Sequence, residues 1–278
     1  MTISEKIARA KTDIDEVYSA GYTKGKAEGG GGSGYDENHY WDILTKKGAL
    51  KRYQYFFAGS AITKEYIEEF VAYLDRRNIT TISFAETKIT DEYCSNMFAK
   101  AAWRRSSSEP LAETIDLSAL CARMDFSGCL GASATFGNAN VMNITADFSN
   151  CEQLYQTFSN SDNSNSKYLD NVNIKVSAKC TYSGTFAYCG SLTKLIFMEG
   201  SVIGQNGLDL QRSTLLSKAS FESVVGALST ETSGLSITVS KTAVNKAFET
   251  SAGANDGSTS AEWENLIAPK TNWTINLA

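Results

Sequence analysis

The sequence predicts an α/β repeat protein: a solenoid with one parallel sheet, preceded by a short N-terminal coiled-coil helix. Three observations carry this prediction: a recurring aromatic–cysteine motif, short alternating apolar runs near its copies, and regularly spaced apolar residues at the N-terminus. Repeats of about 20 to 40 residues with one strand each are typical of solenoids, because a single unit cannot bury its own apolar face. We predict a helix at 1–27, a Gly-rich linker at 28–38, the repeat solenoid at 39–214, and helix–strand repeats with a cap at 215–278.

The N-terminal segment has the apolar spacing of a coiled coil. Its apolar residues recur at intervals of 4, 3, 4 and 3, with charged residues between them. β-branched residues at both core positions of a heptad favour trimers, and two heptads alone are marginally helical in water. We therefore predict that this helix self-associates, as in a homotrimer, or docks on a partner; the alternative is a lone amphipathic helix on its own domain. The predicted contact residues are Ile3, Ile7, Ala10, Ile14 and Val17.

A flexible linker follows the helix. The stretch Gly29–Gly34 contains five glycines and one serine, which offer no side chains for packing. The helix and the body should therefore be mechanically separate.

The body contains several copies of one motif. Phe126-Ser-Gly-Cys129 recurs as Phe148-Ser-Asn-Cys151, and Phe186-Ala-Tyr-Cys189 is a third copy. Weaker copies begin at Phe57 and Phe98. Stacking should place phenylalanine on phenylalanine and cysteine on cysteine, so Cys129, Cys151 and Cys189 should form one buried ladder.

Short β-branched runs near these copies predict the strands. Because parallel strands need long crossovers, and the intervening segments are long enough, consecutive strands should be parallel neighbours. The predicted strands are 81–84, 114–117, 141–144, 172–176, 195–197, 235–239 and 273–277.

The last third of the chain predicts helices between strands. Helices are predicted at 217–228, 240–248 and 261–268; the first is amphipathic with serine caps at its start, and Pro269 ends the third. We expect these helix–strand units to continue the same sheet and to cover the open end of the solenoid, with Trp263 and Trp273 in the cap.

The composition excludes several classes of function. Hydrophobic residues make up 42% of the 278 residues, enough for a core. The net charge of −5 argues against nucleic-acid binding, and no apolar stretch is long enough to span a membrane. The N-terminus lacks the apolar core of a signal peptide, which predicts folding in a reducing cytoplasm with all six cysteines unpaired.

The sequence predicts no catalytic, cofactor or metal site. His39 is the single histidine, and the cysteines lack the spacing of metal ligands. Asp125 and Asp147 occupy equivalent repeat positions, where carboxylates usually hold turns by accepting main-chain N–H bonds. The alternative is a pair of catalytic carboxylates.

One polar surface is predicted as a candidate binding face. Where apolar strand residues face inward, the alternating residues face outward. This face could recognise a host glycan or protein, and the alternative is a merely solvated sheet. Its candidate residues are Ser83, Asp116, Asn143, Thr145, Asn173, Lys175, Ser236 and Thr238.

The repeat resembles a known family. Units of the BspA-like leucine-rich repeats read F-x-x-C-x-x-L-x-x-[LIV], and Phe186, Cys189, Leu192 and Leu195 match all four positions. Over about 53–200 the chain therefore resembles BspA-like leucine-rich-repeat proteins.

The whole layout resembles such proteins encoded by phages and prophages of gut Gram-positive bacteria. The entry Tyr40-Trp41-Asp42 and the C-terminal stretches Leu215–Val225 and Thr232–Val244 carry this resemblance. It implies a virion protein of the tail or another appendage, made in the host cytoplasm, with no enzymatic activity carried over. Its partners would be other virion proteins or its own copies, through the N-terminal helix. The alternative is a BspA-like adhesin on a bacterial cell surface.

Overall fold

The computed structural model describes residues 57–59, 62–83, 95–102, 113–160, 169–249 and 260–278. The chain divides into two units, 1–46 and 47–278. All described residues belong to the second unit, which is considered by itself below. The predicted N-terminal helix, the linker and His39 lie outside the described residues.

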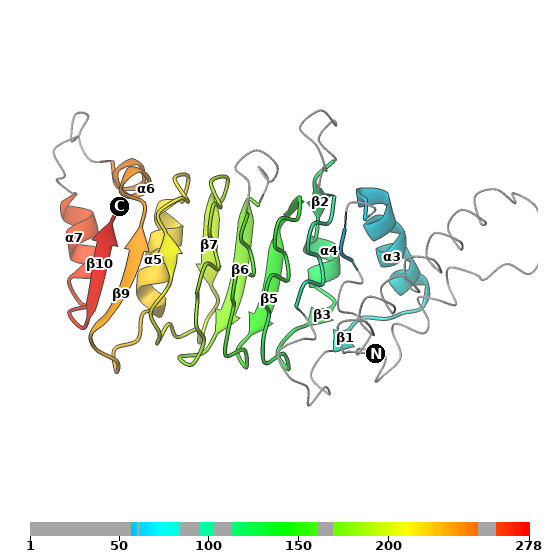
Figure 1. Ribbon diagram of the computed structural model, residues 1–278, viewed down its shortest axis with the longest axis horizontal. Coiled ribbons are helices and arrows are strands. Elements are labelled where there is room, and N and C mark those ends of the chain that lie inside the picture. Colours follow the sequence, from blue (N-terminus) through cyan, green and yellow to red (C-terminus); the bar gives the residue numbers. More distant parts are fainter. Residues whose placement is uncertain (1–56, 60–61, 84–94, 103–112, 161–168, 250–259) are drawn as a thin grey trace, which may run out of the picture. The chain divides into compact units, whose positions relative to one another are not determined.

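The described strands pair in parallel wherever they pair (Figure 1). β2 pairs with β4, with Ile115 opposite Val141, and β5, β6 and β7 follow one another in chain order. The strands are β1 (Ile82–Ser83), β2 (Ile115–Asp116), β3 (Met124–Asp125), β4 (Val141–Met142), β5 (Ile144–Phe148), β6 (Asn171–Val176), β7 (Lys194–Phe197), β8 (Asp209–Leu210), β9 (Leu235–Val239) and β10 (Trp273–Leu277).

Helices lie toward both ends of this stack of strands (Figure 1). The longest of the described helices, α3, buries Ile67, Phe70 and Leu74, and its N-cap Thr63 accepts a hydrogen bond from the N–H of Tyr66. The helices are α3 (Lys64–Arg76), α4 (Ser118–Cys121), α5 (Lys218–Ala227), α6 (Lys241–Ala247) and α7 (Ala261–Ile267).

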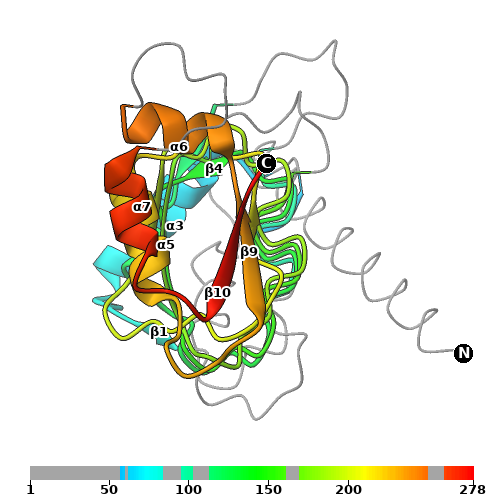
Figure 2. The same ribbon diagram turned by 90° about the vertical axis from the view of Figure 1, so that its left-hand side faces the viewer.

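The chain runs back and forth between two layers, which Figure 2 shows nearly end-on, and we call each such circuit a coil. We call the first the strand layer; it contains β5, β6 and β7, and α5 follows at the edge of β7. We call the second the turn layer; it contains the turn segments 95–102, 133–139, 155–160 and 182–188, and then β8, β9 and β10.

Main-chain hydrogen bonds join successive turn segments. The N–H of Phe98 donates to Thr135 O at 2.7 Å, that of Phe136 to Thr157 O at 2.8 Å, and that of Phe158 to Thr185 O at 3.0 Å. These segments turn at left-handed residues, which recur at equivalent positions in each coil. The equivalent left-handed residues of the first row are Asn96, Ala134, Gln156 and Gly184.

A stack of phenylalanine rings fills the core behind the turn layer. Successive ring centroids lie 4.9, 5.1, 5.5 and 5.2 Å apart, and the planes are within 13° of parallel. Stacked rings contribute about 0.5–1.5 kcal/mol per pair beyond the burial of their area. The ring stack consists of Phe57, Phe98, Phe136, Phe158 and Phe186.

The predicted cysteine ladder is wrong for Cys189. The Cys151 thiol donates to Cys129 O at 3.0 Å, whereas the Cys189 thiol donates to Phe158 O at 3.1 Å. The reason is that the phenylalanines of the motif copies lie in different rows. Phe186 belongs to the ring stack, while Phe148 packs on Phe126 in a separate row. The described cysteines, all buried and unpaired, are Cys121, Cys129, Cys151, Cys180 and Cys189.

The predicted single sheet is also not what the structure has. The described strands form four small sheets, in which β9 pairs with β8 and β10 rather than with β7. The cause is α5, whose Ser220 and Ser223 hydroxyls accept hydrogen bonds from the N–H groups of Leu195 (3.0 Å) and Phe197 (2.8 Å). The edge of β7 is therefore closed by a helix, and the strands continue only in the turn layer.

The C-terminal end is covered by aromatic side chains. Trp263 of α7 contacts the rings of Phe221 and Phe248, with centroids 5.6 and 5.4 Å away. Trp263 and Trp273 are both buried. The serine cap predicted for the helix at 217–228 is wrong for Ser217, whose side chain makes no capping hydrogen bond to α5. Ser240 and Ser260 instead cap α6 and α7, by accepting hydrogen bonds from the N–H groups of Ala243 and Trp263.

Candidate functional site

A strip of polar side chains runs across the outer face of the strand layer. In β5 and β6 the apolar residues are buried and the residues between them are exposed or half-buried. The structure brings together five of the predicted face residues on this strip: Asp116, Asn143, Thr145, Asn173 and Lys175.

The first row of the strip is a chain of hydrogen bonds. Asn143 donates to Asp116 Oδ2 at 2.9 Å, and its own Oδ1 accepts from Asn171 at 2.7 Å. Asn171 also donates to Asp170 Oδ2 at 3.1 Å, and Thr193 donates to the other oxygen of Asp170. Side chains from four coils are thus held in one geometry.

Asn143 holds this row because of its backbone conformation. It has a φ of 58° and lies between β4 and β5, where the chain turns a corner. Asparagine is among the residues that tolerate the left-handed region. The corner lets its amide reach Asp116 on one side and Asn171 on the other.

The carboxyl group of Asp116 is held in its charged form. Partial burial alone would raise the pKa, but hydrogen bonds from the main-chain N–H and the hydroxyl of Ser118, together with the Asn143 amide, outweigh it and lower the pKa of Asp116. The strip therefore carries a fixed negative charge at its β2 end.

Two further rows are looser. Asn173 donates to the Thr145 hydroxyl at 3.4 Å, and the Lys175 ammonium lies 4.0 Å from Asp147 Oδ2. The Oδ1 of Asn173 has no protein partner among the described residues. These rows can donate and accept hydrogen bonds to an outside ligand, whereas the first row is largely satisfied internally.

Two of the predicted face residues lie elsewhere. Ser236 and Thr238 are on β9, in the turn layer, because α5 ends the sheet of β7. Ser83 lies on β1, in register with Asp125 of β3. The predicted face is therefore interrupted, and its continuous part is the strip on β2, β5 and β6.

Sequence reasoning missed two members of the first row, Asp170 and Asn171. Asn171 begins β6 and alternates with the residues named from that strand, so the same period of two would have found it. Asp170 precedes the strand, and the strand pattern gives no signal for it.

Asp125 and Asp147 hold turns. Oδ1 of Asp125 accepts hydrogen bonds from the N–H and hydroxyl of Ser127, at 3.0 and 2.6 Å. Oδ1 of Asp147 accepts from the N–H of Ser149 at 2.9 Å. These are Asx turns at the ends of equivalent strands, which is the role predicted for them rather than that of a catalytic pair.

The buried thiols are poor nucleophiles. Burial raises the pKa of Cys121 and of Cys180 to about 12, and it also raises the pKa of Cys189. In the part of the chain that the structure describes, no group of three or more His, Cys, Asp or Glu side chains could hold a metal ion.

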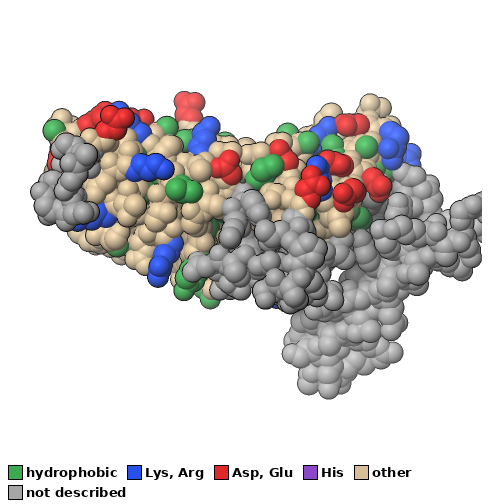
Figure 3. Space-filling view, turned by 90° about the horizontal axis from the view of Figure 1, so that it is seen from above, with side chains coloured by type: hydrophobic (Ala, Val, Ile, Leu, Met, Phe, Trp, Pro, Cys, Tyr) green, Lys and Arg blue, Asp and Glu red, His purple; other side chains and the backbone are tan. Residues whose placement is uncertain are grey.

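Charge is unevenly distributed along the stack. Viewed from above, several acidic side chains gather toward the end that carries α3 and β2, and much of the remaining surface is uncharged (Figure 3). Glu65, Glu68 and Glu69 of α3 are exposed.

In comparisons with known proteins, the chain matches no family model, no curated protein and no solved structure. Among the helices that the structure describes, none combines the length and apolar character needed to cross a membrane.

Proposed function

We propose that this chain is a non-enzymatic structural or host-attachment protein of a phage virion, in the tail or another appendage, and that its body is a leucine-rich-repeat-like solenoid. The observation that supports attachment most directly is the polar strip on β2, β5 and β6. Its side chains are positioned by hydrogen bonds before any partner arrives, which lowers the entropic cost of binding.

The stacked body and the sequence likeness support the rest of the proposal. In the part of the chain that the structure describes, successive coils are joined to their neighbours by main-chain hydrogen bonds, as in repeat proteins that present extended surfaces. The likeness of the C-terminal stretches to phage and prophage proteins supports a place in the virion. The partners in this proposal are a host surface glycan or protein and, through residues 1–27, other virion proteins or further copies.

Two experiments test the proposal. Antibodies raised against residues 40–278 should label purified particles in electron microscopy at a tail or an appendage. Purified protein should also bind whole host cells and compete with phage adsorption.

A double substitution tests the strip itself. Thr145→Lys with Asn173→Lys replaces the loose row with long charged side chains and should abolish binding to cells. Thr230→Lys with Ser233→Lys adds the same two charges at exposed residues outside both the strip and segment 182–188, and serves as the matched control. Labelling of bacterial cells in the absence of particles would instead support the adhesin alternative.

A further inference from the structure

The turn layer is interrupted at one junction. Each earlier junction carries main-chain hydrogen bonds, such as those from Gln156 to Ser183 O (3.1 Å) and from Asn160 to Ala187 O (2.8 Å). Between segments 182–188 and 208–212, both described in full, no main-chain hydrogen bond forms. We call this junction the seam.

The seam leaves a row of donors open. The N–H groups of Gly184, Phe186 and Tyr188 are equivalent to those of Gln156, Phe158 and Asn160, which donate across the preceding junction. Within the described residues these three N–H groups meet no acceptor. Unpaired main-chain donors at a surface are normally satisfied by water or by a ligand.

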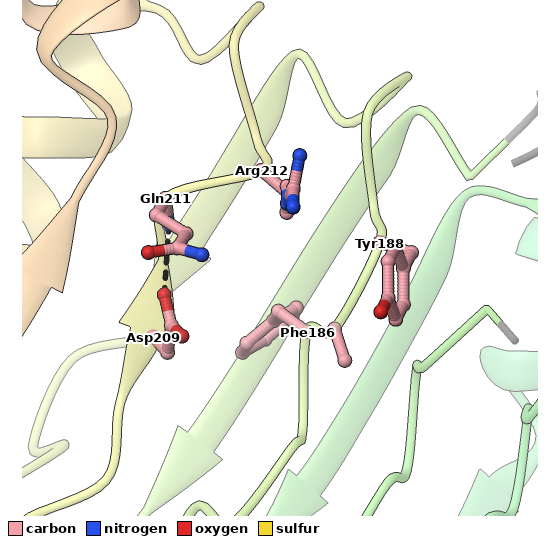
Figure 4. Close-up of a pocket in the computed structure, with 6 residues that line it drawn as sticks. Phe186, Tyr188, Asp209, Gln211 and Arg212 are labelled. Carbon is pink, nitrogen blue, oxygen red and sulfur yellow. Dashed lines mark hydrogen bonds between the residues drawn. The ribbon is translucent and has the colours of Figure 1, made fainter. Parts of the chain in front are cut away.

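A hollow of about 190 Å³ opens at this seam (Figure 4). The buried ring of Phe186, which ends the ring stack, lies at its base, and Ala187 and Tyr188 come from the same segment. Its other side comes from β8 and the residues after it: Asp209, Gln211 and Arg212. The hollow has room for one ring-sized group rather than for a drug-sized ligand.

The lining combines an aromatic surface with donors and acceptors. The Tyr188 side chain is 43% exposed, and the guanidinium carbon of Arg212 lies 5.8 Å from its ring centroid. Oδ1 of Asp209 accepts the N–H of Gln211 at 2.9 Å, which leaves Oδ2 as a free acceptor. Asp209, Gln211 and Arg212 are all exposed at this surface.

We propose that the seam hollow binds one neutral sugar ring of a glycan. A sugar presents hydroxyl groups that both donate and accept hydrogen bonds. The Asp209 carboxylate, the Gln211 amide and the Arg212 guanidinium match them, as do the open N–H groups of Phe186 and Tyr188, which line the hollow. The C–H face of the sugar packs on the exposed surface of Tyr188. The charges of Asp209 and Arg212 balance within the hollow, so the lining has no net charge that would favour an anionic or cationic sugar over a neutral one.

This site names a sugar as one target of the proposed attachment function. Only its biological role rests on that function; the binding itself does not. It places sugar recognition on the turn layer, away from the polar strip. The two surfaces can therefore be tested separately in the same full-length chain.

The test uses an array of neutral and acidic mono-, di- and oligosaccharides with the purified full-length chain. Titration calorimetry then follows with the best neutral sugar. Tyr188→Ala and Asp209→Asn should each lower the affinity at least about tenfold, because each removes a direct contact with the ring. Tyr155→Ala is the matched control, since Tyr155 is a similarly exposed tyrosine (47%) of the turn layer outside the hollow. Circular dichroism verifies folding, and Gln211→Ala is the milder variant if Tyr188→Ala unfolds.

The outcomes separate this site from the proposed function. Binding lost in the seam variants but kept in Tyr155→Ala and in the Thr145/Asn173 variant supports the site. Sugar binding lost only in the Thr145/Asn173 variant overturns the site and leaves attachment through the strip. Preference for acidic sugars, or binding to cells with no sugar bound on the array, also overturns the site. If neither the wild type nor any variant binds cells, the result contradicts the attachment function, and the sugar titration alone decides whether the seam hollow binds a sugar.

Discussion

The carbonyl oxygen of Ala132 accepts hydrogen bonds from two buried threonine hydroxyls. Thr135 donates to it at 2.9 Å from the same coil, and Thr157 donates at 2.6 Å from the next. Thr185 repeats the second contact one coil further on, with Leu154 O at 2.6 Å. Thr157 and Thr185, which precede Phe158 and Phe186 of the ring stack, therefore link their coils to the preceding ones.

Removing single hydroxyls from this row should destabilise the protein by unequal amounts. Thr185→Val and Thr157→Val keep the side-chain shape, and each should cost about 0.5–1.5 kcal/mol, the usual net value of a hydrogen bond. Thr157→Val should cost less, because Ala132 O keeps both the hydroxyl and the N–H of Thr135 as donors, whereas Leu154 O keeps only the N–H of Thr157. Urea unfolding measures both variants, and equal losses would show that the second hydroxyl does not compensate.

Acid should weaken the first row of the polar strip. The pKa of Asp116 is lowered in the folded protein, so its contribution to stability is present above its unfolded pKa of about 4 and is lost as the pH falls through the folded value. Asp116→Asn should be less stable than wild type at pH 7 and should lose less stability between pH 5 and pH 3. Urea unfolding across this range, with Glu222→Gln as a control for lost charge, provides the measurement. Parallel pH profiles for wild type and Asp116→Asn would contradict the assignment.

At the scale of single residues, the sequence predicted contacts only where the two-residue alternation of a strand was enough to place a side chain on one face. Thr145 and Asn173 were found because strand residues alternate. Cys189 was assigned to the wrong row because Phe186 fits two apolar patterns, and only the packing of its ring on Phe158 decides between them.

At the scale of elements, α5 takes the place of a further strand at the edge of β7. Its Ser220 and Ser223 hydroxyls accept the N–H groups that a further strand would have bonded. Open strand edges invite pairing with other chains, so this helix both ends the sheet and protects its edge.

Loss of these serines should expose the edge of β7. Ser220→Ala, at a fully buried position, should cost about 1–3 kcal/mol because the Leu195 N–H is left buried without an acceptor. Adding Ser223→Ala should promote self-association, which light scattering detects alongside urea unfolding. Glu222→Ala, on the same helix and exposed, is the control. A doubly substituted protein that remained as stable as the control would refute the capping role.

The sequence predicted elements better than their connections. Strands lie at all seven predicted places, and helices lie at all three. The missed α3 carries a detectable signal, since Thr63 precedes apolar residues at helical spacing. β3 and β8 have two residues each, too short for any period, and the end of the sheet at β7 depends on a contact between β7 and α5 that no local pattern encodes.

At the scale of the whole molecule, assembly is predicted to depend on the N-terminal segment. Ile7→Ala with Ile14→Ala should dissolve the oligomer and leave the body folded, because the Gly29–Gly34 linker transmits no packing. Each isoleucine should contribute about 2–5 kcal/mol if its site is tightly packed. Light scattering gives the mass and circular dichroism the fold. An unchanged mass would place assembly in the body, and lost body structure would mean that the helix packs on its own domain.

The seam also has a mechanical consequence. Elsewhere in the turn layer, tension along the stack is carried by main-chain hydrogen bonds, but at the seam that layer has none between 182–188 and 208–212. A pulling force on the two ends of the body should therefore first part the coils there, into an N-terminal block that ends with the ring stack and a C-terminal block built on β8, β9 and β10. In the strand layer the same rupture separates β7, which stays paired with β6, from α5. Single-molecule pulling should therefore show a first rupture that releases the chain at about residues 198–207, and a first rupture within the ring stack would contradict this order. A body built this way yields mechanically at the same place where we propose that it holds a sugar.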